Sequence, residues 1–346
     1  MNRKDEHVSL AKAFHKNKVN DFDLIRPMHH SLPETAVNTV DLSTQLFQTH
    51  QSSPFFINAM TGGSEKTTVI NQQLARIAKA TNLMLATGSV SAALKDPSLS
   101  DSFTIVRKEF PQGFLLANVG AGTSLENAQR AVDLFEANAL QIHLNAPQEL
   151  VMPEGDRDFT NWLSLIETIV KTIDVPVVVK EVGFGMTRET IHQLLTVGVQ
   201  TIDVSGNGGT SFTQIENARR KMRELSYLAD FGQSTAISLL EANEVPLNYN
   251  KIASGGIRNA YDIFKCLLLG ADSVGISGAI LDFLLIHGEE KTIALIQQWQ
   301  EELRLLYALV GQTKTTDLRQ VPLTFTGSLL DWCQQRTIDV STYSFR

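Results

Sequence analysis

The sequence predicts a (β/α)8 barrel, and three observations carry this prediction. Eight short apolar runs rich in β-branched residues recur along the 346-residue chain. Each run passes into small or polar residues, and stretches with helical periodicity lie between the runs, as expected for a parallel sheet with right-handed crossovers. An open doubly wound sheet is the alternative, but the chain has neither GxGxxG nor GxxxxGK[ST]. Eight units are also the number that closes into a barrel.

Each predicted element follows from a local pattern. Apolar residues at spacings of three and four predict helices at 71–82, 124–139, 161–174 and 187–198, with Ser124 and Thr187 as N-caps. The eight predicted strand runs are PFFINAMTGG (54–63), LMLATGS (83–89), FLLANVGAG (114–122), ALQIHLN (139–145), PVVVKEVGFG (176–185), TIDVSGNGG (201–209), KIASGGIRN (251–259) and SVGISGA (273–279).

The domain organisation predicted is one domain with two extensions. Residues 54–311 form the barrel, and its last outer helix is expected at 289–311. Residues 1–53 form an N-terminal extension that contributes to the substrate pocket, and residues 312–346 form a C-terminal tail packed on the barrel. The connection 206–236 is the longest after a strand and is expected to carry a loop over the mouth.

Composition excludes several classes of protein. The chain is 43% hydrophobic and 19% charged, as in globular domains, and its net charge of −7 disfavours general binding to nucleic acids or anionic membranes. Cys266 and Cys333 form no CxxC pair, which fits a reducing cytoplasm. The start MNRKDEHVSLAKAF does not resemble a signal peptide, and charged residues interrupt the most apolar stretch, 264–286. We therefore expect a cytoplasmic protein.

Polar and small residues gather where the predicted strands end, which is the face on which barrel enzymes carry their active sites. This enrichment exceeds what packing requires. The residues are Asn58, Thr61, Gly62, Gly63, Thr87, Gly88, Ser89, Asn118, Gly120, Gly122, His143, Asn145, Gln148, Glu149, Lys180, Glu181, Asp203, Ser205, Gly206, Asn207, Thr210, Ser254, Gly255, Gly256, Arg258, Ser277 and Gly278.

The ends of the seventh and eighth strands predict a phosphate site. SGGIRN (254–259) offers backbone N–H groups and the charge of Arg258, and GISGA (275–279) leads into a helix N-terminus. A Gly-Gly pair alone would indicate only a turn. The two turns together match the recurring phosphate site of barrel enzymes.

Two further groups of residues have a functional and a structural interpretation. Lys180 shares a strand face with Val178 and either points into the mouth or escapes to solvent. His143 is either a hydrogen-bonded core histidine or, with Asn145, Gln148 and Glu149, part of a ligand-facing cluster. In the second interpretation Glu149 is an oxygen ligand suited to Mg²⁺, with Gln148 and Glu149 in a loop after the strand.

The segment RKDEH leaves the same choice open. On a helix, Arg3 and His7 lie one turn apart beside Lys4, which makes a compact cationic face that would suit a diphosphate. The alternative is an ordinary solvated first turn.

As a set, these motifs resemble the type 2 isopentenyl diphosphate isomerases, over nearly the whole chain. The matching stretches are RKDEH (3–7), HHSLPE (29–34), AMTGG (59–63), HLN with QE (143–149), VVVKEVGFGM (177–186), SGNGGTSF (205–212), SGGIRN (254–259) and the tail pattern ALVG…LRQVPL. The resemblance implies interconversion of isopentenyl and dimethylallyl diphosphate with reduced FMN and Mg²⁺, without net redox change. It also implies NADPH as the reductant and a homo-oligomer, a tetramer or octamer.

The resemblance also implies roles for individual residues. Catalysis falls to His143, Asn145, Gln148 and Lys180, and Glu149 holds the metal. The substrate diphosphate meets Arg3, Lys4, His7, Ser89, His143, Asn145 and Gln148. FMN contacts Ala59, Met60, Thr61, Gly62, Ser89, Asn118, Lys180, Ser205, Thr210, Gly256, Arg258, Ser277 and Gly278.

The chain departs from the family pattern at two places. Ser89-Val90-Ser91 stands where many members have Ser-Gln-Arg, and Ser277-Gly278 stands where Ala-Arg is common. One competing function is an FMN-dependent 2-hydroxy acid oxidoreductase, which would need a histidine after the seventh strand, and none follows before His287. A flavin-binding scaffold without catalysis would have no use for the cluster from His143 to Glu149.

Overall fold

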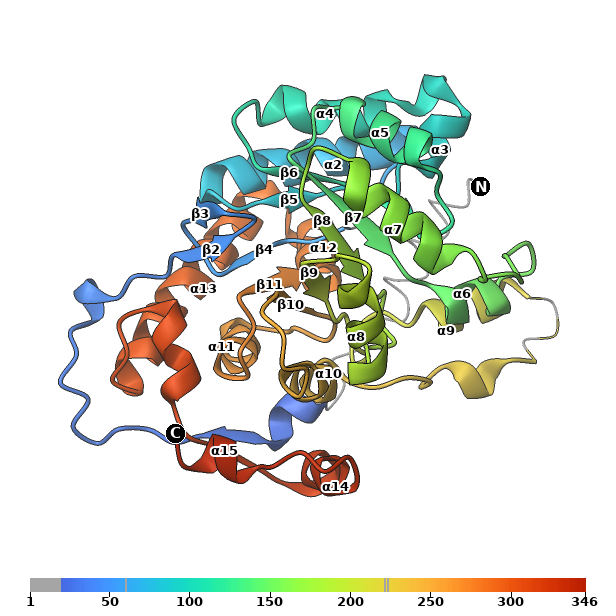
Figure 1. Ribbon diagram of the computed structural model, residues 1–346. Helices are drawn as coiled ribbons and strands as arrows, with labels where there is room; N and C mark the ends of the chain where they lie inside the picture. Colours follow the sequence, from blue (N-terminus) through green and yellow to red (C-terminus); the bar gives the residue numbers. More distant parts are fainter. Residues whose placement is uncertain (1–19, 60, 221, 223) are drawn as a thin grey trace.

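The protein is a closed barrel of eight parallel strands, as predicted. The computed structural model describes residues 20–59, 61–220, 222 and 224–346. The strands follow one another around the barrel in chain order, and the last pairs with the first (Figure 1). They are β4 (Phe55–Ile57), β5 (Leu85–Ala86), β6 (Leu115–Gly120), β7 (Ala139–His143), β8 (Val177–Lys180), β9 (Thr201–Asp203), β10 (Asn250–Ser254) and β11 (Ser273–Ile276).

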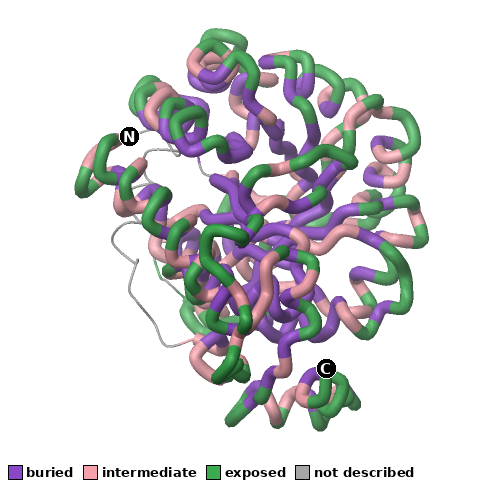
Figure 2. The backbone as a smooth tube through the Cα atoms, turned by 90° about the vertical axis from the view of Figure 1, so that its left-hand side faces the viewer, coloured by how far each residue is buried: buried purple, intermediate pink, exposed green. Residues whose placement is uncertain are grey.

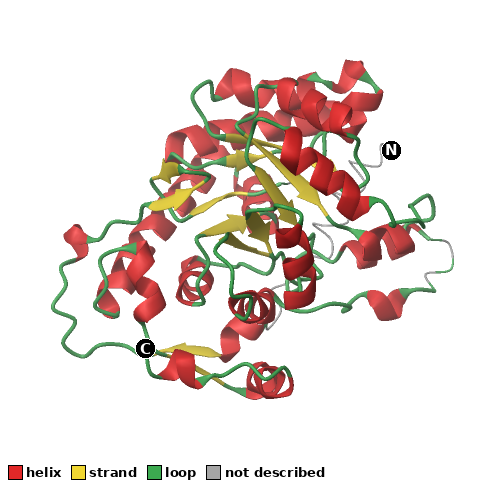
Figure 3. Ribbon diagram, viewed as in Figure 1, coloured by secondary structure: helices red, strands yellow, loops and turns green. Residues whose placement is uncertain are grey.

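Helices surround the barrel and bury their inner faces against it (Figures 2 and 3). None of the described helices combines the length and the apolar character that a membrane-spanning segment requires. The helices are α2 (Glu65–Thr81), α3 (Ser91–Lys95), α4 (Asp101–Glu109), α5 (Leu125–Asp133), α6 (Ala146–Val151), α7 (Trp162–Thr172), α8 (Arg188–Thr196), α9 (Phe212–Arg219), α10 (Thr235–Asn243), α11 (Ala260–Leu268), α12 (Gly278–His287), α13 (Glu289–Leu309), α14 (Gly327–Gln335) and α15 (Ser341–Ser344).

Capping residues explain where the helices begin and where the predictions were wrong. Ser124 and Thr187 cap α5 and α8 as predicted. Helix α2 begins earlier than residue 71, because the hydroxyl of Ser64 accepts the N–H of Thr67 and starts the helix there. Helix α5 ends earlier than residue 139, and Glu136, at φ 52°, turns the chain towards β7.

The barrel interior is divided into an apolar floor and a polar upper layer. The floor is built from Phe56, Met84, Ala86, Leu116, Ala139, Val178 and Ile252. A hairpin of β2 (Thr44–Leu46) and β3 (Thr49–Gln51) closes it from below, and Phe47 in its turn stacks on Phe114 at 5.3 Å between ring centroids. Because side chains alternate along a strand, the next inward residues after the floor lie at the mouth.

The N-terminal extension and the tail pair with each other. Strand β1 (Ile25–Pro27) runs antiparallel to β12 (Leu323–Phe325), and a short 3₁₀ turn, η1 (Asp21–Leu24), precedes β1. Other 3₁₀ turns lie at η2 (Val37–Thr39), η3 (Pro97–Leu99), η4 (Ser226–Leu228) and η5 (Thr315–Gln320).

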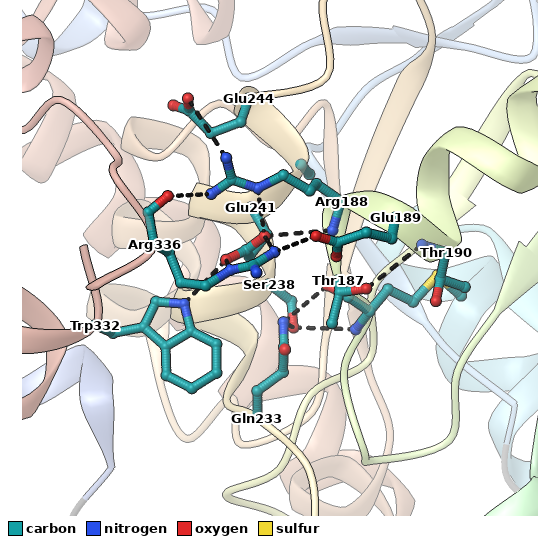
Figure 4. A network of polar contacts seen from close by, with 12 residues as sticks. Thr187, Arg188, Glu189, Thr190, Gln233, Ser238, Glu241, Glu244, Trp332 and Arg336 are labelled. Carbon is teal, nitrogen blue, oxygen red and sulfur yellow. Dashed lines mark hydrogen bonds and ion pairs between the residues drawn. The ribbon is translucent and has the colours of Figure 1, made fainter. Parts of the chain in front are cut away.

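Helix α14 of the tail is joined to the barrel through one buried carboxylate (Figure 4). Glu241 on α10 is fully buried and receives hydrogen bonds from Arg188 of α8 and from Trp332 and Arg336 at the end of the tail helix. Burial alone would raise the pKa of Glu241, but the bonds from Arg336, Arg188 and Trp332 outweigh it and lower the pKa to about 2.

Candidate active site

A cavity of about 1390 Å³ opens at the carboxyl ends of the strands and collects most of the predicted site residues. Gly62 is an exception: it does not line the cavity, and its backbone packs on the ring of Phe103. Arg3, Lys4, His7 and Met60 lie outside the described residues. The predicted residues that line the cavity are Ala59, Thr61, Ser89, Asn118, His143, Asn145, Gln148, Glu149, Lys180, Ser205, Thr210, Gly256, Arg258, Ser277 and Gly278.

The ends of β10 and β11 form a cradle of backbone groups. Gly255 and Gly256 have φ angles of 91° and 74°, and a Cβ atom on Gly255 would lie 2.0 Å from the carbonyl oxygen of Gly206. The turn therefore requires glycine. Helix α12 begins at Gly278, directly after Ser277, so its first N–H groups have no partner within the helix and can bind an anion. This geometry fits a phosphate group.

Arg258 brings less positive charge to this cradle than its sequence position indicated. Its guanidinium is held by two carboxylates, Asp23 of the N-terminal extension (Nη2–Oδ1 2.7 Å) and Asp262 of α11 (Nε–Oδ2 2.7 Å). The hydrogen bond from Arg258 lowers the pKa of Asp23 to about 2 although burial opposes it. With the charge largely balanced, backbone N–H groups contribute more to anion binding here than the guanidinium does.

Lys180 is buried at the mouth, above Val178 of the floor, so the prediction that it points inward is confirmed. Burial lowers the pKa of Lys180, while Asp203 on the neighbouring strand and Glu181 act in the opposite direction. Burial also raises the pKa of Asp203, and it raises that of Glu181 to about 8 although the carboxylate accepts the N–H groups of Val182 and Phe184. Lys180 is thus a buried amine beside the cavity, and its pKa is lowered by the loss of contact with water.

His143, at the end of β7, belongs to a chain of buried hydrogen bonds. Its Nδ1 lies 2.8 Å from Oδ1 of Asn118, and Nδ2 of Asn118 donates to Oε1 of Gln141 at 3.1 Å. Gln141 donates to Oδ1 of Asn58 at 2.9 Å, and Asn58 donates to Asp203 at 2.9 Å. The chain spans the polar layer of the barrel from β7 to β9.

The other members of the cluster are carried by the short helix α6, which corrects the prediction of a loop after β7. Pro147 in the first turn favours a helix start at this point. Asn145 and Glu149 then lie one turn apart, and the Asn145 amide donates to Oε1 of Glu149 at 2.8 Å. The N–H of Asp156 donates to Oε2, so the carboxylate of Glu149 is oriented at the rim of the cavity.

Gln148 is held by a carboxylate that sequence reasoning missed. Its amide nitrogen donates to Oε1 of the fully buried Glu216 at 2.9 Å, and Arg219 pairs with the other oxygen of Glu216 at 2.5 Å. Both partners belong to α9, within the long connection 206–236, and residues of this connection line the cavity. An acidic residue on an otherwise buried face of α9 was the available signal.

Gln141 is a further residue whose part in the site was missed. Gln141 lies two positions before His143 and faces the same side of β7, opposite Asn118 in register. A fully buried glutamine in the middle of a strand was the signal, because buried amides require partners.

The loop after β5, where the chain departs from the family pattern, keeps two of its three residues at the cavity. Ser89 and Ser91 both line the cavity and their hydroxyls are 2.9 Å apart, while Val90 is fully buried and lies away from the cavity. Within the described part of the chain, no three carboxylate, histidine or cysteine side chains gather as a ready metal site. A metal held by Glu149 would take its remaining ligands from substrate and water.

Comparisons with known proteins agree with this geometry. Residues 115–324 match the model of a family described as FMN-dependent dehydrogenase. The chain is 50% identical over 339 residues to an isopentenyl-diphosphate delta-isomerase of Latilactobacillus sakei subsp. sakei (strain 23K), covering 98% of this chain and 97% of the relative. It is 44% identical over 338 residues to the protein of that name from Staphylococcus aureus (strain MSSA476), with the same coverage.

Solved structures with lower identity show the same fold. Flavocytochrome b2 with pyruvate bound superimposes with a TM-score of 0.70 at 18% identity, covering 94% of this chain and 84% of the other. A mandelate oxidase gives a TM-score of 0.63 at 15% identity, covering 93% and 91%. From the barrel, the cavity and the near full-length relatives together, the chain belongs to the isopentenyl-diphosphate delta-isomerases of type 2, built on the barrel of the FMN-dependent dehydrogenases.

Proposed function

We propose that this protein converts isopentenyl diphosphate reversibly into dimethylallyl diphosphate by a 1,3-allylic shift. The reaction uses reduced FMN and Mg²⁺ and is redox-neutral overall, and NADPH serves to reduce the flavin. The names of the near full-length relatives support the substrate, and the match to the FMN-dependent dehydrogenase family supports the flavin. We further propose a cytoplasmic homo-oligomer, in keeping with two free buried cysteines and with the family resemblance.

One observation carries the proposal: a polar cluster on β7 and α6 faces a phosphate cradle across the same cavity. The cluster comprises His143, Asn145, Gln148 and Glu149. Strand β7 is the fourth and β11 the eighth around the barrel, so the cluster and the cradle lie on opposite sides of the ring. A flavin phosphate in the cradle would leave the cluster available for a second ligand.

The cradle residues are proposed to hold FMN through backbone N–H groups at Gly256 and at the start of α12, with Lys180 beside the ring. When bound, reduced FMN supplies an acid or base that can act on the carbon skeleton. Because Lys180 is buried, its charge acts in a medium of low dielectric constant and changes the electronic balance of a nearby ring strongly.

The cluster is proposed to hold the substrate head group. Glu149 is oriented by Asn145 and by the N–H of Asp156, which suits a carboxylate that binds Mg²⁺ on a diphosphate. Gln148 is fixed by Glu216, and His143 by Asn118. These contacts hold the side chains in place before substrate arrives, so positioning costs little at the moment of reaction.

The N-terminal cations Arg3, Lys4 and His7 remain proposed ligands of the diphosphate. The described chain begins beside the cavity: the amide of Asn20 donates to the carbonyl of Gly256 at 2.9 Å. This contact places Asn20 itself at the mouth of the barrel, which is the observation that supports the proposal.

Two features disfavour a 2-hydroxy acid oxidoreductase. Among the described residues that line the cavity, His143 is the one histidine, and His287 packs on Phe283 at the end of α12. Arg258, the arginine after the seventh strand that could hold a carboxylate, is already bound by Asp23 and Asp262.

The test is proton NMR of isopentenyl diphosphate in D₂O with the purified protein, Mg²⁺ and FMN reduced by dithionite without oxygen. The expected result is dimethylallyl diphosphate that carries deuterium, with no net oxidation of the flavin. No conversion, together with flavin that is reoxidised by keto acids, would favour the oxidoreductase instead.

A further inference from the structure

The donor and acceptor atoms along the hydrogen-bond chain that ends at His143 can be assigned one after another. The assignment starts from a backbone N–H group. The N–H of Ala59 lies 2.8 Å from one atom of the Asn58 side-chain amide. A peptide N–H can only donate, so this atom must be the oxygen Oδ1. The nitrogen Nδ2 of Asn58 then faces Asp203, an acceptor at 2.9 Å. The backbone N–H of Ala59 therefore fixes the orientation of the Asn58 amide independently of Gln141, Asn118 and His143.

Each following amide inherits its orientation from the one before. The atom of Gln141 that lies 2.9 Å from Oδ1 of Asn58 must be the donor Nε2, so the other end of Gln141 is the acceptor Oε1. Asn118 must then present its donor Nδ2 to Gln141, at 3.1 Å. The remaining oxygen of Asn118 lies 2.8 Å from Nδ1 of His143.

The last step assigns the histidine proton. Because Oδ1 of Asn118 can only accept, Nδ1 of His143 must carry hydrogen. The other ring nitrogen, Nε2, lies on the side of Gly120, where a Cβ atom would stand 3.4 Å from it, and both residues line the cavity. A reversed amide anywhere in this hydrogen-bond chain would bring two acceptors or two donors together at a buried position, which is strongly unfavourable.

We propose that the buried amides Asn58, Gln141 and Asn118 act as positioning residues that fix His143 in its Nδ1–H form, so that any proton His143 gains is bound at Nε2, facing the substrate. The Nδ1–H to Asn118 bond is kept in both charge states of the ring. The ring can thus gain and lose a proton at Nε2 without rearrangement of the amides beneath it. The functional half of this inference rests on the proposed isomerase activity, whereas the tautomer does not.

The direct test is ¹⁵N NMR of the full-length, FMN-loaded protein with labelled histidine, without substrate, at a pH where the ring is neutral. The His143 signals are identified by their loss in His143→Gln. We expect a pyrrole-type Nδ1 and a pyridine-type Nε2, with the Nδ1–H form favoured by about tenfold or more. A predominant Nε2–H form in the unmodified protein would overturn the proposal.

Variants of Gln141 test whether the chain is the cause. Gln141→Met keeps the size of the fully buried side chain but removes both bonds, so Asn118 can reverse and the two tautomers should reach comparable populations. Gln141→Glu should keep the Nδ1–H form, because a buried, protonated carboxyl can donate to Asn58 and accept from Asn118. Unchanged tautomer populations in Gln141→Met would contradict the proposal.

The matched control is Gln233→Met. Gln233 is also buried, and its amide donates to the carbonyl of Met186 and to the Ser238 hydroxyl. It takes no part in the hydrogen-bond chain that ends at His143. It should lose stability without altering the signals of His143. If Gln141→Met does not fold, the unmodified protein and Gln141→Glu still decide. A protein with the expected tautomer but no conversion of isopentenyl diphosphate would reject the proposed function alone.

Discussion

Glu241 and Asp203 are both completely buried carboxylates, and their surroundings differ in kind. Glu241 lies outside the barrel and receives hydrogen bonds from Arg188, Arg336 and Trp332 (Figure 4). Asp203 lies inside the barrel and accepts from Asn58, Ser254 and the N–H of Ser205. At Glu241 the hydrogen bonds outweigh burial and lower the pKa, whereas at Asp203 burial outweighs the nearby Lys180 and the hydrogen bonds and raises the pKa.

The difference shows how one fold separates stability from chemistry. The cations around Glu241 neutralise it, and this network joins the tail to the barrel. The hydrogen-bond donors of Asp203 are neutral, and one of them, Asn58, leads through two further amides to a histidine at the cavity. The predictions below therefore expect changes at the first network to affect unfolding and changes at the cavity to affect turnover.

The largest expected effect on stability is that of Glu241→Gln. It should lower the free energy of unfolding by about 3 kcal/mol, the low end for a broken buried ion pair, because Arg188 and Arg336 are partly exposed and can turn to water. Urea denaturation measures the loss. Turnover per folded molecule should stay unchanged, and Glu244→Gln, which removes a partly exposed partner of Arg188, should cost far less. A large loss of turnover in fully folded Glu241→Gln would contradict the expectation that this network affects stability and not turnover.

The pH dependence of unfolding sharpens the same point. Glu241 has a folded-state pKa of about 2 against an ordinary value of 4.5, so its contribution is complete above pH 4.5 and is lost as the pH falls towards 2. This drop in pKa corresponds to about 3 kcal/mol. The free energy of unfolding of the unmodified protein should therefore fall more steeply below pH 4.5 than that of Glu241→Gln. Parallel curves would show that Glu241 is not the group responsible.

Glu149→Gln should have the opposite profile. Loss of the proposed metal ligand is expected to reduce turnover about hundredfold, or about 2.7 kcal/mol in activation free energy, while FMN absorbance and unfolding remain close to normal. The assay is conversion of isopentenyl diphosphate at increasing Mg²⁺. Glu154→Gln is the control, because Glu154 also lines the cavity but pairs with Arg219 instead of Asn145. Full activity in Glu149→Gln would remove Glu149 from the site.

Gly256→Ala should give the smallest effect, and it should reduce both stability and FMN binding. A side chain at φ 74° costs about 1–2 kcal/mol of strain, and in the cradle this should also weaken FMN binding. Gly270→Ala is the matched control, at φ 98° and away from the cavity, so it should lose similar stability with unchanged FMN affinity. Flavin titration and thermal unfolding separate the two. Equal FMN affinity in both variants would argue against the cradle.

Local patterns were sufficient for the barrel, because strand length, helical periodicity and capping are encoded within a few residues. All eight predicted runs contain or overlap a strand, and Ser124 and Thr187 cap their helices. Contacts between distant segments could not be read in the same way. The pairing of Arg258 with Asp23, for example, joins residues on different elements and alters the charge of a correctly located site.

The same limit applies to the cavity. Strand ends indicated His143, Asn145, Gln148 and Glu149 because they follow an apolar run. Their supporting partners on other elements, such as Glu216, leave no local signature. Burial and register decide those contacts, and both are properties of the finished fold.

The pairing of β1 with β12 has a consequence for synthesis of the protein. Strand β1 is made long before β12, which is its only strand partner among the described residues. The turn η1 just before β1 places Asn20 and Asp23 against the phosphate cradle. A nascent chain can therefore place η1 on the barrel before β12 exists, and the strand pairing of β1 forms only after β12 has been made.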